Sequence, residues 1–194
     1  SRARLLAYDF PSQTLPGNDR PYWKDVGTIK AYWDAHMDLL QHPSPLTLFN
    51  FQWPIRTVSF ADPPGFTYPS QGKNCSVVGA LRAEGSRVMG AAVHRSVLSR
   101  NCVIQPGAVV EESIIGQGVV IGENCQIRRA IVDAHNVIPP NTVIGYNPEV
   151  DAEHYTYDRE SGVVVVSMPT IRLRSPQDAP AMYSLLQPGG GYVD

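Results

Sequence analysis

Residues 103–145 read VIQPGAVVEESIIGQGVVIGENCQIRRAIVDAHNVIPPNTVIG, and this stretch decides the fold. Whole turns repeat every 17 residues, from Val103 to Val120 to Val137. Six-residue repeats of inward aliphatic side chains are typical of a parallel β-helix, whose rungs are stable only when stacked. The sequence therefore predicts a mainly β protein with a left-handed parallel β-helix over residues 75–167. The anchor positions, most of them six residues apart, are Val103, Val109, Ile115, Val120, Gln126, Val132, Val137 and Val143.

Glycine and asparagine recur at the expected corners between these anchors. Both residue types tolerate the left-handed backbone conformation that tight corners require. A helical interpretation fails because the apolar positions lack a 3.6-residue period, and an antiparallel sandwich needs longer strands. The residues predicted at or near the corners are Gly107, Gly118, Gly122, Asn124, Asn136, Asn141 and Gly145.

Three further segments flank the repeat. Residues 21–41 contain a predicted amphipathic helix that begins after an N-cap at Thr28. Its aromatic face includes Tyr32 and Trp33. Residues 42–74 are rich in proline and are expected to form a linker. After the repeat, a short helix at 149–155 and a strand at 163–166 are expected to close the β-helix, and 168–194 to form a loose tail.

Composition limits the classes of function. With a net charge of -2 and a pI near 6.2, the chain has no electrostatic reason to bind nucleic acid or an acidic membrane. No apolar run is long enough to span a bilayer, so a cytoplasmic protein is expected. Three cysteines without a CxxC pair predict reduced thiols. The opening SRARLLAYDF alternates like a strand, but no earlier segment is available to pair with it. We therefore expect the chain to be a fragment.

Four motifs together resemble one enzyme family. They are PYWKDVGT at 21–28, WPIRT at 53–57, QIRRAIVD at 126–133 and NVIPPNTVIGYNPEVDA at 136–152. In this order they resemble glucose-1-phosphate adenylyltransferase, also called ADP-glucose pyrophosphorylase. Many transferases share the hexad repeat, whereas PYWKDVGT and WPIRT are more specific to this family.

The resemblance implies a reaction and an assembly. Family members join ATP and glucose 1-phosphate into ADP-glucose and pyrophosphate, with Mg²⁺, for glycogen or starch synthesis. They are usually homotetramers, regulated by phosphorylated or nucleotide effectors. Residues 1–41 would then be the end of an α/β nucleotidyltransferase domain. Because the rest of that domain is not in this sequence, the chain alone is expected to be inactive.

The resemblance also implies site residues. Asp25 is the expected metal ligand at the phosphates, and Trp23 is expected to shape the same segment. Magnesium is commonly held by one or two carboxylates together with substrate phosphates, which suits Asp25. From its position alone, Asp25 is a loop acid ahead of a helix N-terminus, where negative charge is favourable.

Arginines are the expected effector ligands, because a guanidinium binds phosphate through two parallel hydrogen bonds. The candidates are Arg129, Arg128 and Arg56, with Arg172 as a weaker equivalent. Such arginines on a β-helix can equally be solubilising or paired with nearby acids.

Two other functions stay open. A β-helix acyltransferase would use His94 or His135 as general base, and a non-catalytic regulatory or scaffold subunit would assemble through the β-helix. Mannose 1-phosphate guanylyl enzymes share the architecture, but WPIRT and RRAIVD favour the adenylyl enzyme.

Overall fold

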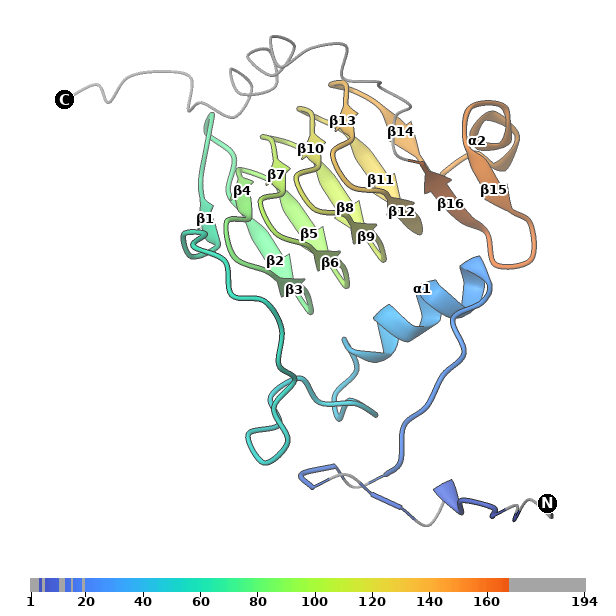
Figure 1. Ribbon diagram of the computed structural model, residues 1–194. Coiled ribbons are helices and arrows are strands. Elements are labelled where there is room, and N and C mark those ends of the chain that lie inside the picture. Colours follow the sequence, from blue (N-terminus) through green and yellow to red (C-terminus); the bar gives the residue numbers. More distant parts are fainter. Residues whose placement is uncertain (1–3, 5, 11–12, 15, 19, 168–194) are drawn as a thin grey trace, which may run out of the picture.

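The computed structural model describes residues 4, 6–10, 13–14, 16–18 and 20–167. Its central feature is a left-handed parallel β-helix with three sheets, which confirms the predicted fold class (Figure 1). The first sheet contains β1 (Phe66–Tyr68), β4 (Arg87–Met89), β7 (Val103–Ile104), β10 (Val120–Ile121) and β13 (Val137–Ile138). The second contains β14 (Val143–Ile144), β11 (Gln126–Arg128), β8 (Val109–Glu111), β5 (Ala92–His94) and β2 (Ser76–Val78). The third contains β15 (Thr156–Asp158), β16 (Val163–Val166), β12 (Ala130–Val132), β9 (Ile114–Ile115), β6 (Val97–Leu98) and β3 (Leu81–Arg82).

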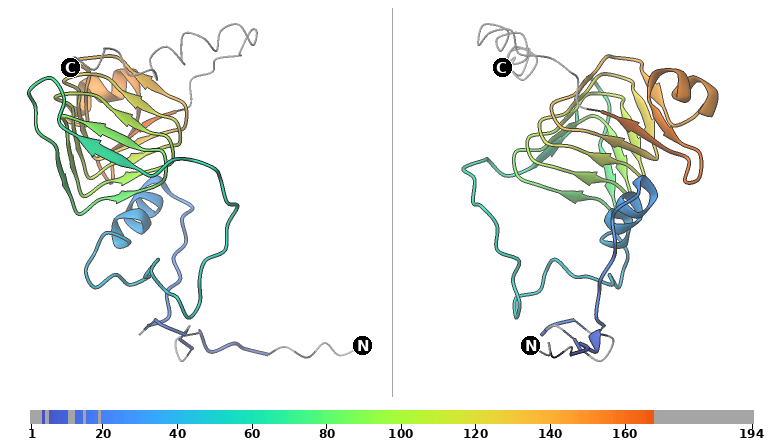
Figure 2. Two further views of the ribbon diagram at one scale, coloured as in Figure 1. Left: turned by 90° about the vertical axis from the view of Figure 1, so that its left-hand side faces the viewer. Right: turned by 45° about the vertical axis from the view of Figure 1, so that its right-hand side comes forward.

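Strand register follows the repeat. Val120 pairs with Val103 on one side and with Val137 on the other, so the 17-residue period is the length of one rung. The stacked rungs are visible as parallel layers in Figure 2. Each rung exposes its backbone polar groups to the next, which is why the short strands are stable only as a stack.

The interior is a column of aliphatic side chains, but not all the predicted anchors point into it. In the first two sheets the residue after the anchor is buried, as with Ile121 and Ile127, both 0% exposed. The predicted anchors Val137 and Val143 are 40% and 49% exposed. Because side chains alternate across a strand, an error of one residue exchanges the inner and outer faces.

One corner of the β-helix is built from residues that were not predicted as corner positions. Arg95, Glu112 and Arg129 are 17 residues apart and all have a left-handed backbone, with φ of 46°, 46° and 47°. This conformation costs a non-glycine residue about 1–2 kcal/mol. The buried hydroxyl of Ser113 supports the corner, because it donates to the carbonyl of Glu111 and accepts from the amide of the following rung. Gly122 and Asn136, which were predicted at or near corners, do not have positive φ themselves, but His135 next to Asn136 does, as does Asn124 two residues after Gly122.

Helix α1 (Ile29–Asp38) begins where predicted, with the Thr28 hydroxyl accepting from the amide of Ala31 at 3.1 Å. It lies against the outside of the third sheet (Figure 2). Trp33 and Met37 are its buried residues, and they pack with Ile114 and Val163. The face that carries Trp33 and Met37 therefore packs against the β-helix itself, whereas Tyr32 of the predicted aromatic face is 39% exposed.

The β-helix is closed by an insertion after β14. Helix α2 (Pro148–His154) starts at the Asn147 cap, and β15 then pairs antiparallel with β16. The buried carboxylate of Asp151 accepts from the amide of Gly145 with both oxygens, at 3.1 Å each. The predicted closing helix and strand are both present.

Segment boundaries differ from the prediction at two places. Strand β1 lies inside the predicted linker, because it pairs with β4 and belongs to the β-helix. The opening strand is not present in residues 4 and 6–10, the described part of that segment. The predicted tail, 168–194, lies outside the described residues. Within the described part of the chain, no helix is long and apolar enough to cross a membrane.

Candidate functional site

The segment that carries Asp25 has no regular secondary structure and leads into the Thr28 cap of α1. Lys24 turns toward the helix and pairs with Asp38, with Nζ and Oδ2 2.6 Å apart. Tyr22 donates to the same oxygen at 3.1 Å. Burial, followed by the contact with Asp38, raises the pKa of the Tyr22 hydroxyl. Tyr22 and Lys24, two residues apart, therefore both attach this segment to Asp38 in the last turn of the helix.

Asp25 and Trp23 face away from that anchor. Asp25 is exposed, and its Oδ1 accepts from the amide of Gly27 at 3.2 Å. Trp23 is 74% exposed. The second carboxylate oxygen of Asp25 has no partner among the described residues, so it is accessible to a cation.

Asp25 could bind magnesium only together with ligands from outside the described residues. No group of three His, Cys, Asp or Glu side chains suited to a metal occurs in the part of the chain that the structure describes. Magnesium often uses one or two protein carboxylates and takes its other ligands from phosphates and water. Asp25 is therefore adequate as one ligand, and a substrate phosphate would have to supply others.

Arg128 and Arg129 are adjacent in sequence but point to different surfaces. Arg128 is exposed on the outer face of the second sheet, where its register partner is Glu111. Arg129 lies at the corner, where its Nη2 donates to the carbonyl of Ser161 at 2.8 Å. Its guanidinium lies 4.6 Å from the Trp33 ring centroid, so the corner arginine contacts α1.

Arg56 is exposed in a segment whose apolar side chains are also exposed. Phe51 is 91% and Trp53 54% exposed. The segment is attached to the β-helix further on, where Arg100 forms an ion pair with Asp62 and stacks over Phe60. Among the described residues, the predicted effector ligands Arg56, Arg128 and Arg129 form no hydrogen bond or ion pair with one another or with Asp25, the predicted metal ligand.

The two histidines occupy separate positions. His94 lies on the second sheet between Ser76 Oγ, 3.0 Å from Nε2, and Glu111 Oε1, 3.8 Å from Nδ1. All three side chains are partly or fully open to solvent on a flat sheet face, where an ion pair is weak. His135 is an exposed corner residue with φ of 61°.

A sequence profile described as "GlmU-like, C-terminal hexapeptide" matches residues 62–166, which span the β-helix. The chain belongs to this GlmU-like hexapeptide family. That assignment covers the stacked rungs, and it leaves residues before 62 outside the match.

Curated relatives of this hexapeptide-family chain extend the similarity toward its N-terminus. A glucose-1-phosphate adenylyltransferase of Photobacterium profundum is 40% identical over 164 residues, covering 84% of this chain and 40% of the relative. An enzyme of the same name from Deinococcus radiodurans is 40% identical over 165 residues, with the same coverage. One from Bifidobacterium longum is 36% identical over 175 residues, covering 88% of this chain and 42% of the relative. The resemblance found in the motifs is confirmed, and the chain spans about two fifths of the length of these relatives.

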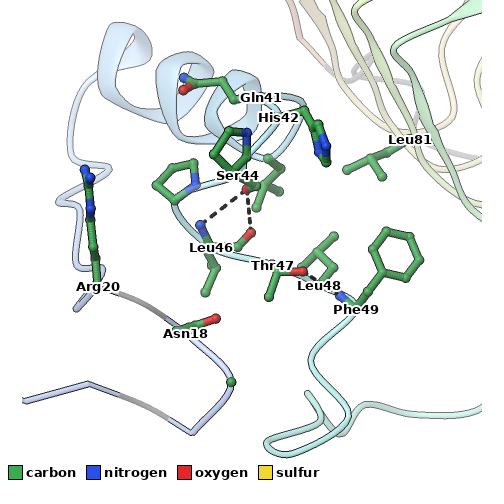
Figure 3. A pocket seen from close by; sticks show the side chains of 14 residues that line it. Asn18, Arg20, Gln41, His42, Ser44, Leu46, Thr47, Leu48, Phe49 and Leu81 are labelled. Atoms are coloured by element: carbon green, nitrogen blue, oxygen red, sulfur yellow. Dashed lines mark hydrogen bonds between the residues drawn. The ribbon is translucent and has the colours of Figure 1, made fainter.

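The GlmU-like chain also has a cavity that the sequence motifs do not predict. Its volume is about 610 Å³, and it lies between the end of α1, the start of the linker and Leu81 of β3 (Figure 3). Arg20 and His42 contribute to its lining. Because the lining residues come from three distant segments, no local motif could have predicted it. Arg172, the remaining effector candidate, lies outside the described residues.

Proposed function

We propose that this chain is the C-terminal part of a glucose-1-phosphate adenylyltransferase that converts ATP and glucose 1-phosphate into ADP-glucose and pyrophosphate. The observation that carries the proposal is the similarity to enzymes of that name at about 40% identity over 84% of the chain. The matched length exceeds the hexapeptide repeat, so it includes segments that other hexapeptide proteins need not share.

Asp25 is proposed as the metal ligand of this reaction. Its carboxylate is exposed and has one oxygen without a partner in the described residues, and the anchoring of Lys24 to Asp38 fixes the backbone next to it. When bound, Mg²⁺ neutralises charge on the transferring phosphoryl group. Trp23 is proposed to limit the positions that the Asp25 segment can take.

Regulation and assembly form the second part of the proposal. Arg128 and Arg56 are exposed and can bind phosphorylated or nucleotide effectors through paired N–H donors. Arg129 has fewer free donors, because its guanidinium already contacts Ser161, Glu112 and Trp33. We propose a homotetramer assembled in part through the β-helix.

The test is ADP-glucose formation by the full-length protein that contains this chain, with saturating ATP, glucose 1-phosphate and Mg²⁺. Loss of an outer ligand partner typically lowers metal affinity or activity about 10–100-fold. Replacement of a direct ligand, Asp25→Asn, should therefore lower turnover by at least about 100-fold. The matched control is Asp34→Asn on α1, whose half-buried carboxylate pairs with Lys30 and with no other cation among the described residues. Full activity of Asp25→Asn with an unchanged melting temperature would remove the metal role.

A further inference from the structure

The corner residues Glu112 and Arg129 hold α1 by two contacts with Trp33, and they pair with each other. The carbonyl of Glu112 accepts the indole N–H of Trp33 at 2.8 Å. The guanidinium of Arg129 stacks over the Trp33 ring, and its Nη1 lies 3.5 Å from Glu112 Oε2. Trp33 itself is 8% exposed. The Trp33 indole is therefore held by a hydrogen bond and by a stacked guanidinium, and it is shielded from solvent.

The C-terminal end of α1 holds the segment with Asp25. Asp38, in the last turn, accepts from Lys24, Tyr22 and Gln41, at 2.6, 3.1 and 3.0 Å. The segment thus folds back along the helix, and both of its ends are attached to α1, since Thr28 caps the first turn. A displacement of α1 on the β-helix would carry the Asp25 carboxylate with it.

We propose that Trp33 and Arg129 are positioning residues for the Asp25 carboxylate, acting through α1 and its contact with Lys24. The inference rests on the proposed function, because it assigns Asp25 a ligand role. It gives the β-helix an indirect part in the chemistry: through α1, the corner sets where the carboxylate lies relative to the phosphates.

A purely structural role for the corner makes a different prediction. If Arg129 only stabilised the fold, its replacement would lower the melting temperature and the amount of active enzyme. The Mg²⁺ concentration for half-maximal rate would then stay constant. If Arg129 positions Asp25, that concentration rises while the fold is retained, because the carboxylate no longer meets the metal at the right distance.

Arg95 offers a matched control. It shares the left-handed conformation of Arg129, with φ of 46° against 47°, and pairs with the same carboxylate, with Nε 3.5 Å from Glu112 Oε1. In the described residues, the guanidinium that stacks over the Trp33 ring is that of Arg129 and not that of Arg95. Arg95→Met therefore removes an arginine from the same corner without removing the contact with α1.

The experiment uses the full-length protein with Arg129→Met, Arg129→Lys, Trp33→Phe and Arg95→Met. We expect Arg129→Met and Trp33→Phe to raise the half-saturating Mg²⁺ concentration about 10-fold, the lower end of the range for outer-shell changes. Arg129→Lys keeps a cation over the ring and should raise it less, while Arg95→Met should leave it at the wild-type value.

Amide hydrogen exchange, measured without metal or substrates, supplies a readout independent of activity. Amides of α1 should exchange faster in Arg129→Met and Trp33→Phe than in wild type and in Arg95→Met. Faster exchange with an unchanged Mg²⁺ dependence would overturn the inference and leave the proposed function intact. A wild-type protein that forms no ADP-glucose would overturn the proposed function, and the inference with it.

Discussion

The indole nitrogen of Trp33 donates a 2.8 Å hydrogen bond to the main-chain carbonyl of Glu112, across 79 residues of sequence. This bond joins α1 to a corner of the β-helix. Met37 continues the contact with Ile114 and Val163, so the helix is packed against the third sheet along its buried face. The segment before the linker and the β-helix after it therefore form one packed structure in the described residues.

Trp33→Phe should lower the free energy of unfolding by about 1–3 kcal/mol, because it leaves the partly buried Glu112 carbonyl without its donor. Denaturant unfolding at equilibrium measures the change. Trp53→Phe is the control, since Trp53 is 54% exposed and its replacement should have almost no effect. Equal effects of the two substitutions would contradict the docking described for α1.

Ile121→Ala should be among the most destabilising core substitutions. Ile121 is 0% exposed and stacks between Ile104 and Ile138 in the first sheet, so truncation leaves a cavity that neighbouring rungs cannot fill. The expected loss is about 2–5 kcal/mol. Val143→Ala, at a position 49% exposed, should lose far less. Similar losses would show that the inner and outer faces are assigned wrongly.

Gly145→Ala should destabilise the protein more than Gly72→Ala. Both glycines have positive φ, 85° and 71°, and alanine in this region costs about 1–2 kcal/mol. At Gly145 a Cβ would also overlap the carbonyl oxygen of Arg128, whereas at Gly72 it would meet nothing within 4 Å. The difference between their melting temperatures isolates the steric part, and equal melting temperatures would rule out the close approach at Gly145.

Cys102 predicts a specific dependence of stability on pH. Burial raises the pKa of its thiol from 9.0 to about 12. The folded state therefore keeps its proton at a pH where the unfolded chain loses it. Its contribution is fully present below pH 9.0 and is lost as the pH rises toward about 12.

Between pH 9 and pH 10 this group should remove about 1 kcal/mol from the free energy of unfolding. Cys102→Ala, though less stable overall, should show a correspondingly smaller decline over the same interval. Parallel declines in the two proteins would mean that the thiol ionises equally well when folded.

Much of the fold could be predicted because the repeat is a local pattern. The 17-residue period alone predicts the register of Val103, Val120 and Val137, and the strand pairing confirms it. The period could not decide between the neighbours Val143 and Ile144, because both are β-branched and either can face inward. It also missed the left-handed corner at Arg95, Glu112 and Arg129, where side-chain contacts rather than glycine accompany the strained backbone.

The candidate site was less predictable. Thr28 and the helix after it follow from capping and periodicity, but no sequence pattern says that Trp33 meets a carbonyl 79 residues away. Asp25 stood out only through its resemblance to a family motif. Its exposed carboxylate and the turn of Lys24 toward Asp38 depend on three-dimensional packing.

The most direct test of the account is the choice of substrates by the full-length protein. Pyrophosphate release should be measured with ATP and glucose 1-phosphate, and in parallel with GTP and mannose 1-phosphate. We predict ADP-glucose as the product, at a rate well above that of the guanylyl reaction. No turnover with either pair, by a folded protein, would contradict the account and favour a regulatory or scaffold subunit.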